Sequence, residues 1–131
     1  MYKNKKIIIT YGTFDLFHIG HLKILNRLAC LGDFLIVGVS TDDFNALKGK
    51  ETIIPYSDRA EIVKNIKSVD LVLPESSWDQ KIYDIKKYHV DVFGMGDDWK
   101  GKFDFLSDYC EVVYLSRTPG ISSTFIKKKI N

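Results

Sequence analysis

The sequence predicts an α/β fold in which a doubly wound parallel sheet of about five strands is flanked by helices. Two observations carry this prediction. Five short apolar runs rich in Ile and Val lack polar alternation, which is typical of strands buried on both faces. Segments with helical periodicity separate these runs. The length of 131 residues suits a single domain, residues 1–131, that can bury a core without disulfides.

The predicted strands are residues 6–11, 34–39, 69–73, 90–95 and 112–115, and the predicted helices are residues 20–31, 57–67, 79–88 and 122–130. Leu22, Leu25 and Ala29 form an apolar stripe on the first helix. Ser57 and Ser122 are predicted N-caps, because a serine oxygen accepts hydrogen bonds from free backbone N–H groups. Strand–helix–strand repetition gives a Rossmann-like sheet, in which ligands bind outside the carboxyl ends of the strands.

Composition argues against several classes of protein. The net charge of +2 is too small to indicate a nucleic-acid or membrane-surface partner. No apolar run approaches the length of a membrane span, and the first residues lack the apolar core of a signal peptide. Cys30 and Cys110 do not form a disulfide framework and are interpreted as free thiols. We therefore expect a cytoplasmic protein that neither inserts into membranes nor binds nucleic acid.

The most informative motif is Thr13-Phe-Asp-Leu-Phe-His-Ile-Gly-His21, which follows the first predicted strand and opens the first helix. His18 and His21 lie three residues apart at a helix N-terminus and present ring N–H donors on one face. The helix end adds free backbone N–H groups and partial positive charge, which suit a phosphate chain. The alternatives are a core histidine beside a surface one, or a zinc site with His89, although no cysteine lies at zinc-finger spacing.

A second motif, Arg117-Thr-Pro-Gly-Ile-Ser-Ser-Thr124, follows the last predicted strand. A guanidinium binds phosphate through two parallel hydrogen bonds. Ser122 at an N-cap would leave helix amides directed at an anion. The alternative is a capped C-terminal helix with a surface arginine. Phosphate binding is favoured because this motif would face the first one across the same edge of the sheet.

The two motifs resemble those of the cytidylyltransferase family in the HxGH nucleotidyltransferase superfamily. The likeness runs from Ile7 to about Lys129 and includes Ser40-Thr-Asp-Asp-Phe44, Trp78-Asp-Gln-Lys81 and Met95-Gly-Asp-Asp-Trp-Lys-Gly-Lys-Phe103. His-x-Gly-His alone is a weak match, but the combination with Thr-Phe-Asp and a distant Arg-Thr-x-Gly-Ile-Ser is strong. Pro119 stands where the family often has an acid, and Ser123 replaces a frequent threonine.

The resemblance implies roles for individual residues. The residues expected to stabilise the transition state are His18, His21, Lys48 and Arg117. Those expected to contact the nucleotide are Gly12, Thr13, Gly20, Lys50, Asp98, Thr118, Ile121 and Ser122. Those expected to face the acceptor or to organise the site are Asp15, Arg59, Asp70, Trp78 and Trp99.

The residues alone leave other interpretations open for several of these positions. Lys48 and Lys50 would, from composition, be solvated loop lysines. Arg59 would pair on the surface with Glu61 or Asp58. Asp15 could cap the helix, Asp70 could simply precede a strand, and Trp78 could belong to ordinary packing.

The resemblance also implies an activity: transfer of CMP from CTP to a phosphorylated small alcohol, with release of pyrophosphate. An acceptor phosphate is largely dianionic at neutral pH, so it can attack the α-phosphorus in line without a general base. Whole-chain likeness favours sn-glycerol 3-phosphate as acceptor, a role in teichoic-acid or capsule synthesis, and a homodimer. Mg²⁺ is expected to arrive with CTP rather than to occupy a protein cage.

Several alternatives to this function remain. Ethanolamine, choline or ribitol phosphate could replace the glycerol acceptor. An adenylyltransferase of the same superfamily is the nearest enzymatic rival, although such families usually differ in the C-terminal motif. A non-catalytic nucleotide-sensing module is disfavoured, because both histidines and Arg117 are present.

Overall fold

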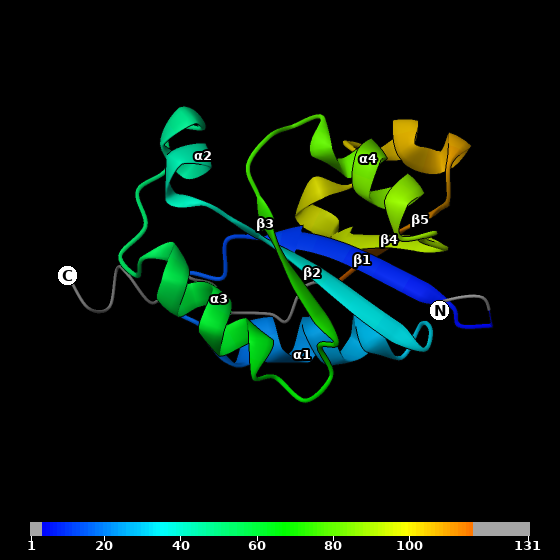
Figure 1. The fold of residues 1–131 in the computed structure, drawn as a ribbon, viewed down its shortest axis with the longest axis horizontal. Coiled ribbons are helices and arrows are strands. Elements are labelled where there is room, and N and C mark those ends of the chain that lie inside the picture. The colour runs from blue at the N-terminus through cyan, green and yellow to red at the C-terminus, as the bar shows by residue number, and fades with distance from the viewer. Residues whose placement is uncertain (1–3, 117–131) are drawn as a thin grey trace.

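The computed structural model describes residues 4–116, which form a parallel five-stranded sheet with helices on both faces (Figure 1). The strand order is β3-β2-β1-β4-β5, and every neighbouring pair is parallel. Along the chain the elements are β1 (Ile7–Gly12), α1 (Ile19–Ala29), β2 (Phe34–Ser40), α2 (Asp42–Leu47), α3 (Tyr56–Lys64), β3 (Leu71–Glu75), α4 (Gln80–Lys87), β4 (Val92–Gly96), η1 (Asp97–Trp99), η2 (Asp104–Asp108) and β5 (Glu111–Leu115). The predicted doubly wound α/β fold is confirmed.

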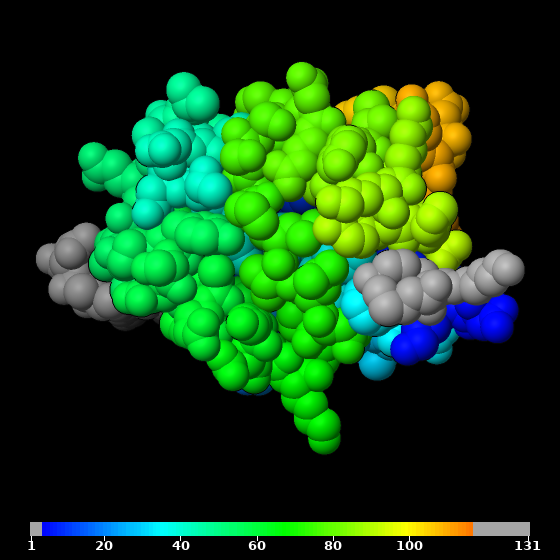
Figure 2. All heavy atoms as spheres, viewed as in Figure 1, coloured from blue at the N-terminus to red at the C-terminus, as the bar shows by residue number. Residues whose placement is uncertain are grey.

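Each face of the sheet has its own apolar core. One core joins the sheet to α1 and α3 through Leu25, Leu28 and Val63. The other joins the sheet to α4 and η2 through Ile85 and Leu106. Figure 2 shows the atoms of the edge strand β3 facing the viewer, between those of α3 on one side and those of α4 on the other. Burial on both faces explains why the central strand β1 reads as an unbroken apolar run.

The strand order places a ligand crevice at the end of β1. The chain moves from β1 outward to β2 and β3, and then returns to the other side of β1 for β4 and β5. In doubly wound sheets, ligands bind outside the carboxyl ends of the strands where the order reverses. The loop between β1 and α1, which carries the first histidine motif, lies at this point.

Some boundaries differ from the prediction. Helix α2 was not predicted, although Thr41 caps it by accepting a hydrogen bond from the Phe44 N–H group at 3.1 Å. The short η2 was also missed. The predicted N-cap at Ser57 is wrong, because α3 begins at Tyr56 and its N-cap is Pro55. The predicted helix 122–130 and its cap Ser122 lie outside the described residues.

No helix within residues 4–116 combines the length and the apolar character needed to cross a membrane.

Candidate active site

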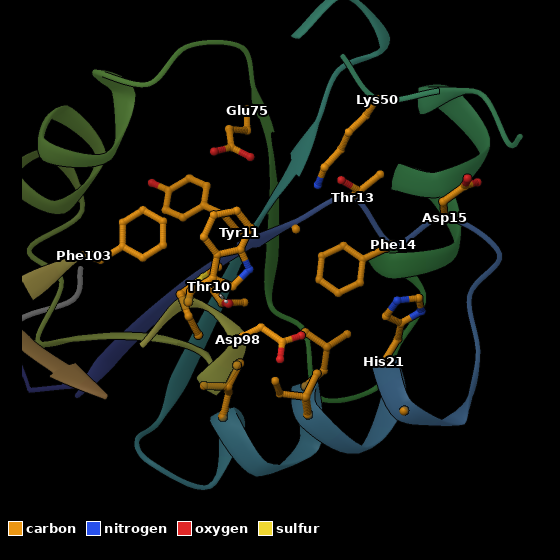
Figure 3. A pocket seen from close by; sticks show the side chains of 18 of the residues that line it. Thr10, Tyr11, Thr13, Phe14, Asp15, His21, Lys50, Glu75, Asp98 and Phe103 are labelled. Atoms are coloured by element: carbon orange, nitrogen blue, oxygen red, sulfur yellow. Dashed lines mark hydrogen bonds between the residues drawn. The ribbon is translucent and has the colours of Figure 1, made fainter. Parts of the chain in front are cut away.

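A cavity of about 500 Å³ lies at the carboxyl ends of the strands (Figure 3). Its walls come from the β1–α1 loop, the segment after α2, the ends of β3 and β4, and the first turn of α4. The predicted site residues that line it are Gly12, Thr13, Asp15, His18, Gly20, His21, Lys48, Lys50, Trp78, Asp98 and Trp99. Arg117, Thr118, Ile121 and Ser122 lie outside the described part of the chain.

His18 and His21 form a reciprocal cap on α1. His18 Nδ1 accepts a hydrogen bond from the Gly20 backbone N–H at 3.0 Å, and His21 Nδ1 accepts one from the His18 backbone N–H at 3.2 Å. A neutral imidazole that accepts at Nδ1 carries its proton on Nε2. The rings stack with centroids 3.8 Å apart. Both histidines are therefore held as Nε2–H donors at the cavity wall.

His18 Nε2 is placed to donate a hydrogen bond to a ligand in the cavity. It is buried and has no hydrogen-bond partner among residues 4–116. Buried polar atoms are nearly always hydrogen-bonded, so an unpartnered donor that lines a cavity is suited to an anionic ligand. The N-terminus of α1 adds its backbone N–H groups to the same place.

Both histidines are electrically neutral at neutral pH. Burial lowers the pKa of His18 below its usual value. Burial lowers the pKa of His21 to about 4, the charge of His18 adds to the shift, and Asp15 opposes it. With Nδ1 accepting a bond and Nε2 protonated, neither ring is placed to act as a general base. The pair can instead donate hydrogen bonds to negative charge that develops on a phosphate.

The low pKa of His21 predicts how stability depends on pH. The histidine pKa is 6.5 in the reference state and about 4 in the folded protein, so the unfolded chain binds more protons between these values. Folded stability should be fully present above pH 6.5 and should fall as the pH falls toward 4. In His21→Gln, glutamine keeps the cap acceptor but does not titrate. As the pH is lowered from 6.5 toward 4, the melting temperature should therefore fall more steeply for the wild type than for His21→Gln. Equal pH dependence of the two melting temperatures would contradict the low pKa of His21.

The β1–α1 loop is strained and is held by a buried carboxylate. Phe14 and Leu16 have left-handed backbones, with φ of 55° and 49°. Asp15, only 3% exposed, accepts hydrogen bonds from the Ile53 and Ile54 N–H groups, both at 2.9 Å. Asp15 was expected to face the acceptor. In the structure its carboxylate ties the loop to the segment before α3, so it organises the site.

Arg59 organises the same region from behind the cavity lining. It is fully buried, and its Nε donates to the Ile54 carbonyl at 2.8 Å. Its Nη1 donates to the carbonyls of Thr13 and Ser40, both at 2.8 Å, and its Nη2 contacts Asp42 at 2.7 Å. Hydrogen bonds from the Tyr56 backbone and from Arg59 lower the pKa of Asp42. The surface pairing considered for Arg59 is therefore excluded.

Asp70 lies away from the site. Its carboxylate accepts a hydrogen bond from the Leu35 N–H group at 2.8 Å, near the amino end of β2. The cavity is at the carboxyl ends of the strands, and Asp70 does not line it. The structure does not support a role in organising the site. Asp70 directly precedes β3 and therefore lies at the amino end of that strand, away from the cavity. Its suggested role in a subunit contact stays a prediction.

Two lysines reach the cavity from the segment after α2. Lys48 Nζ lies 4.4 Å from the ring centroid of Phe44 and 5.6 Å from that of Trp78. Burial lowers the pKa of Lys48, with Glu75 opposing and neighbouring cations adding to the shift. Lys50 Nζ lies 5.9 Å from the Trp99 ring centroid. Lys48 is thus a partly desolvated cation at the wall of the pocket, rather than a fully solvated loop lysine.

Sequence reasoning missed an ion pair in the cavity wall. Lys81 Nζ lies 2.6 Å from Glu75 Oε2, and both side chains are almost fully buried. Glu75 ends β3, so the rule that ligands bind at carboxyl ends of strands could have identified it. Tyr11 was also missed as a wall residue: its hydroxyl donates to Asp84 at 2.7 Å, and burial raises its pKa.

Comparisons with known proteins identify the family of this chain. The family described as cytidylyltransferase-like matches residues 9–129. The glycerol-3-phosphate cytidylyltransferase of Bacillus spizizenii is 59% identical over 123 residues, covering 94% of this chain and 95% of that protein. The enzyme of the same name from Staphylococcus aureus is 53% identical over 125 residues, covering 95% of each.

Among solved structures, the lipopolysaccharide core biosynthesis protein from Thermoplasma volcanium GSS1 superimposes with a TM-score of 0.79. It shares 24% identity, and the match covers 88% of this chain and 99% of that one. This likeness supports the fold. The matching family and the near full-length relatives show that the chain belongs to the cytidylyltransferase-like family and groups with its glycerol-3-phosphate cytidylyltransferases.

Proposed function

We infer that this protein is a nucleotidyltransferase that transfers CMP from CTP to sn-glycerol 3-phosphate, giving CDP-glycerol and pyrophosphate. The observation that carries this inference is the reciprocal histidine cap, which presents two Nε2–H donors at the wall of a cavity of substrate size. The names of the near full-length relatives support the choice of nucleotide and acceptor.

The reaction needs positioning and charge stabilisation. An oxygen of the acceptor phosphate forms a bond to the α-phosphorus of CTP, and the bond from that phosphorus to pyrophosphate breaks. His18 and His21 donate hydrogen bonds to the oxygens on which charge grows, and the α1 amides add their partial charge. Lys48 supplies a cation close by. A dianionic acceptor oxygen is already a nucleophile, so the histidines do not have to remove a proton.

Several parts of this proposal rest on family likeness. Arg117, Thr118, Ile121 and Ser122 would bind the triphosphate opposite the histidines. Mg²⁺ would enter as the CTP complex, and in residues 4–116 no group of three or more His, Cys, Asp or Glu side chains is arranged to hold a metal. The cytoplasm, where CTP is made, is the proposed location, and synthesis of teichoic-acid or capsule-type polymers the proposed role.

The test is pyrophosphate release with each of four nucleoside triphosphates against a panel of phosphorylated alcohols. We expect release only when an acceptor is present, and CTP should exceed ATP by at least about tenfold, equivalent to roughly 1.4 kcal/mol. Glycerol 3-phosphate should be used better than ethanolamine, choline or ribitol phosphate. Equal turnover with ATP would overturn the cytidylyl assignment, and a better acceptor would overturn the glycerol assignment.

A homodimer is proposed on the same family likeness. A chain of this size has a large surface relative to its volume, and self-association through a two-fold interface is the commonest way to cover part of it. Light scattering on an active preparation at micromolar concentration should give twice the mass of 15.1 kDa. A monomer mass would contradict the proposal.

A further inference from the structure

The buried carboxylate of Glu75 lies in the cavity wall, and residues 4–116 bond only one of its two oxygens. Glu75 is 4% exposed, lines the cavity, and makes one ion pair, from Oε2 to Lys81 Nζ at 2.6 Å. Within residues 4–116 its other oxygen, Oε1, accepts no hydrogen bond. Figure 3 shows the Glu75 carboxylate at the end of the cavity near Tyr11 and Phe103, across from His21.

An ion pair whose second carboxylate oxygen faces the cavity can accept a hydrogen bond from a further donor. Removing a carboxylate from water is costly, and the cost is offset only when the remaining lone pairs are also satisfied. Lys81 is not free to move toward Oε1. Its Nζ is packed among the rings of Tyr11, Trp78 and Phe103, at 4.8, 5.4 and 5.4 Å from their centroids. A ligand group that donates a hydrogen bond to Oε1 would complete the site.

The charges around Glu75 limit the chemical class of the ligand group that can donate to Oε1. A phosphate would be repelled by the carboxylate, so the acceptor phosphate belongs on the side of the histidines and Lys48. An ammonium group, as in ethanolamine or choline phosphate, would meet the cations Lys81 and Lys48. A neutral hydroxyl can donate to Oε1 without either conflict.

We propose that Glu75 is a specificity-determining residue that selects hydroxylated acceptors by accepting a hydrogen bond from a hydroxyl group of the acceptor alcohol. The proposal rests on the function inferred above and names the part of the site that reads the alcohol. Lys81 holds the carboxylate in position. A site that hydrogen-bonds a substrate hydroxyl rejects analogues lacking it, because its own buried polar group is then left unpaired.

The test compares glycerol 3-phosphate with propyl phosphate, which has the same carbon chain but no hydroxyl group. In the wild type kcat/KM should favour glycerol 3-phosphate by about 100-fold or more. In Glu75→Gln, the oxygen retained by the amide remains with Lys81, so an NH₂ donor faces the ligand. The preference should fall at least about tenfold, mainly through the KM for glycerol 3-phosphate, with the KM for CTP nearly unchanged. Glu111→Gln, at the amino end of β5, is the matched control and should keep the full preference.

Each outcome decides the matter. Equal loss with both acceptors in Glu75→Gln would mean that Glu75 only positions Lys81, and the proposal would be wrong. If Glu75→Gln fails to fold, the wild-type ratio still tests the idea, because similar use of propyl phosphate would overturn it. If the wild type uses CTP and glycerol 3-phosphate, the inferred function stands whatever the variant does. If it does not use glycerol 3-phosphate at all, both inferences fall.

Discussion

Replacing His18 or His21 by alanine should lower turnover by on the order of 10²- to 10³-fold, the loss that follows removal of one preorganised donor to a developing anion. The structural reason is that each ring is fixed before substrate arrives. The reciprocal cap holds both Nδ1 atoms in hydrogen bonds and leaves Nε2–H as the donor. For His18 that donor is buried and unpartnered within the described residues, so the ligand does not compete with an existing hydrogen bond.

An alanine at position 18 also removes the helix cap, so the catalytic effect must be separated from a stability effect. His18→Asn provides the separation, because an asparagine oxygen can take the place of Nδ1 and is among the best N-caps. We expect His18→Asn to melt near the wild-type temperature and still to lose turnover on the scale of the alanine variant. Near-normal turnover in a folded His18→Asn protein would remove this imidazole from the mechanism.

The sequence predicted the sheet and the histidine site because both depend on local patterns. Unbroken apolar runs identify strands buried on two faces, and the spacing of His18 and His21 is itself the capping geometry of α1. The carboxyl-end rule then brought the β1–α1 loop and the turn with Asp98 to one cavity. These are features that a short stretch of chain determines by itself.

What the sequence could not predict depends on which distant residues meet. Lys81 and Glu75 are six residues apart, but their burial follows from α4 packing on the sheet beside Phe103. Asp15 contacts amides almost forty residues away, with sequence separations of 38 and 39. Asp70 was misplaced for the opposite reason: it adjoins a site-forming strand in sequence but lies at the far end of that strand. Helix α2 has an N-cap at Thr41 that could have indicated its start. The helix was missed because it has only six residues.

Arg59 should contribute more to the stability of the fold than any other polar residue around the cavity. Its guanidinium joins three segments, namely the β1–α1 loop at Thr13, the end of β2 at Ser40, and the segment before α3 at Ile54. The hydrogen bond to the Ser40 carbonyl is buried and those to Thr13 and Ile54 are partly buried, and an unsatisfied buried polar group costs roughly 1–3 kcal/mol. Asp42 contributes less, because its side chain is 51% exposed and can be rehydrated.

Arg59→Met should therefore destabilise the protein by at least about 3 kcal/mol, from several unsatisfied carbonyls together. For a domain of this size that corresponds to a fall in Tm of roughly 10 °C. Arg59→Lys should recover little, because an ammonium cannot span the acceptors that a planar guanidinium reaches. Lys64→Met, an exposed change on the same helix α3, should shift Tm by no more than about 2 °C and serves as the matched control.

The Arg59 variants should also separate organisation of the site from chemistry. Thr13 lines the cavity while its carbonyl is held by Arg59, so loss of the guanidinium should loosen the loop that leads to His18. We expect Arg59→Lys, assayed well below its Tm, to lose turnover while added CTP raises its Tm less than that of the wild type, because binding must then also order the loosened loop, which weakens the affinity for CTP. If Arg59→Lys has wild-type turnover and the wild-type Tm, the guanidinium does not hold this loop. A single ammonium group would then be able to replace the four hydrogen bonds of Arg59.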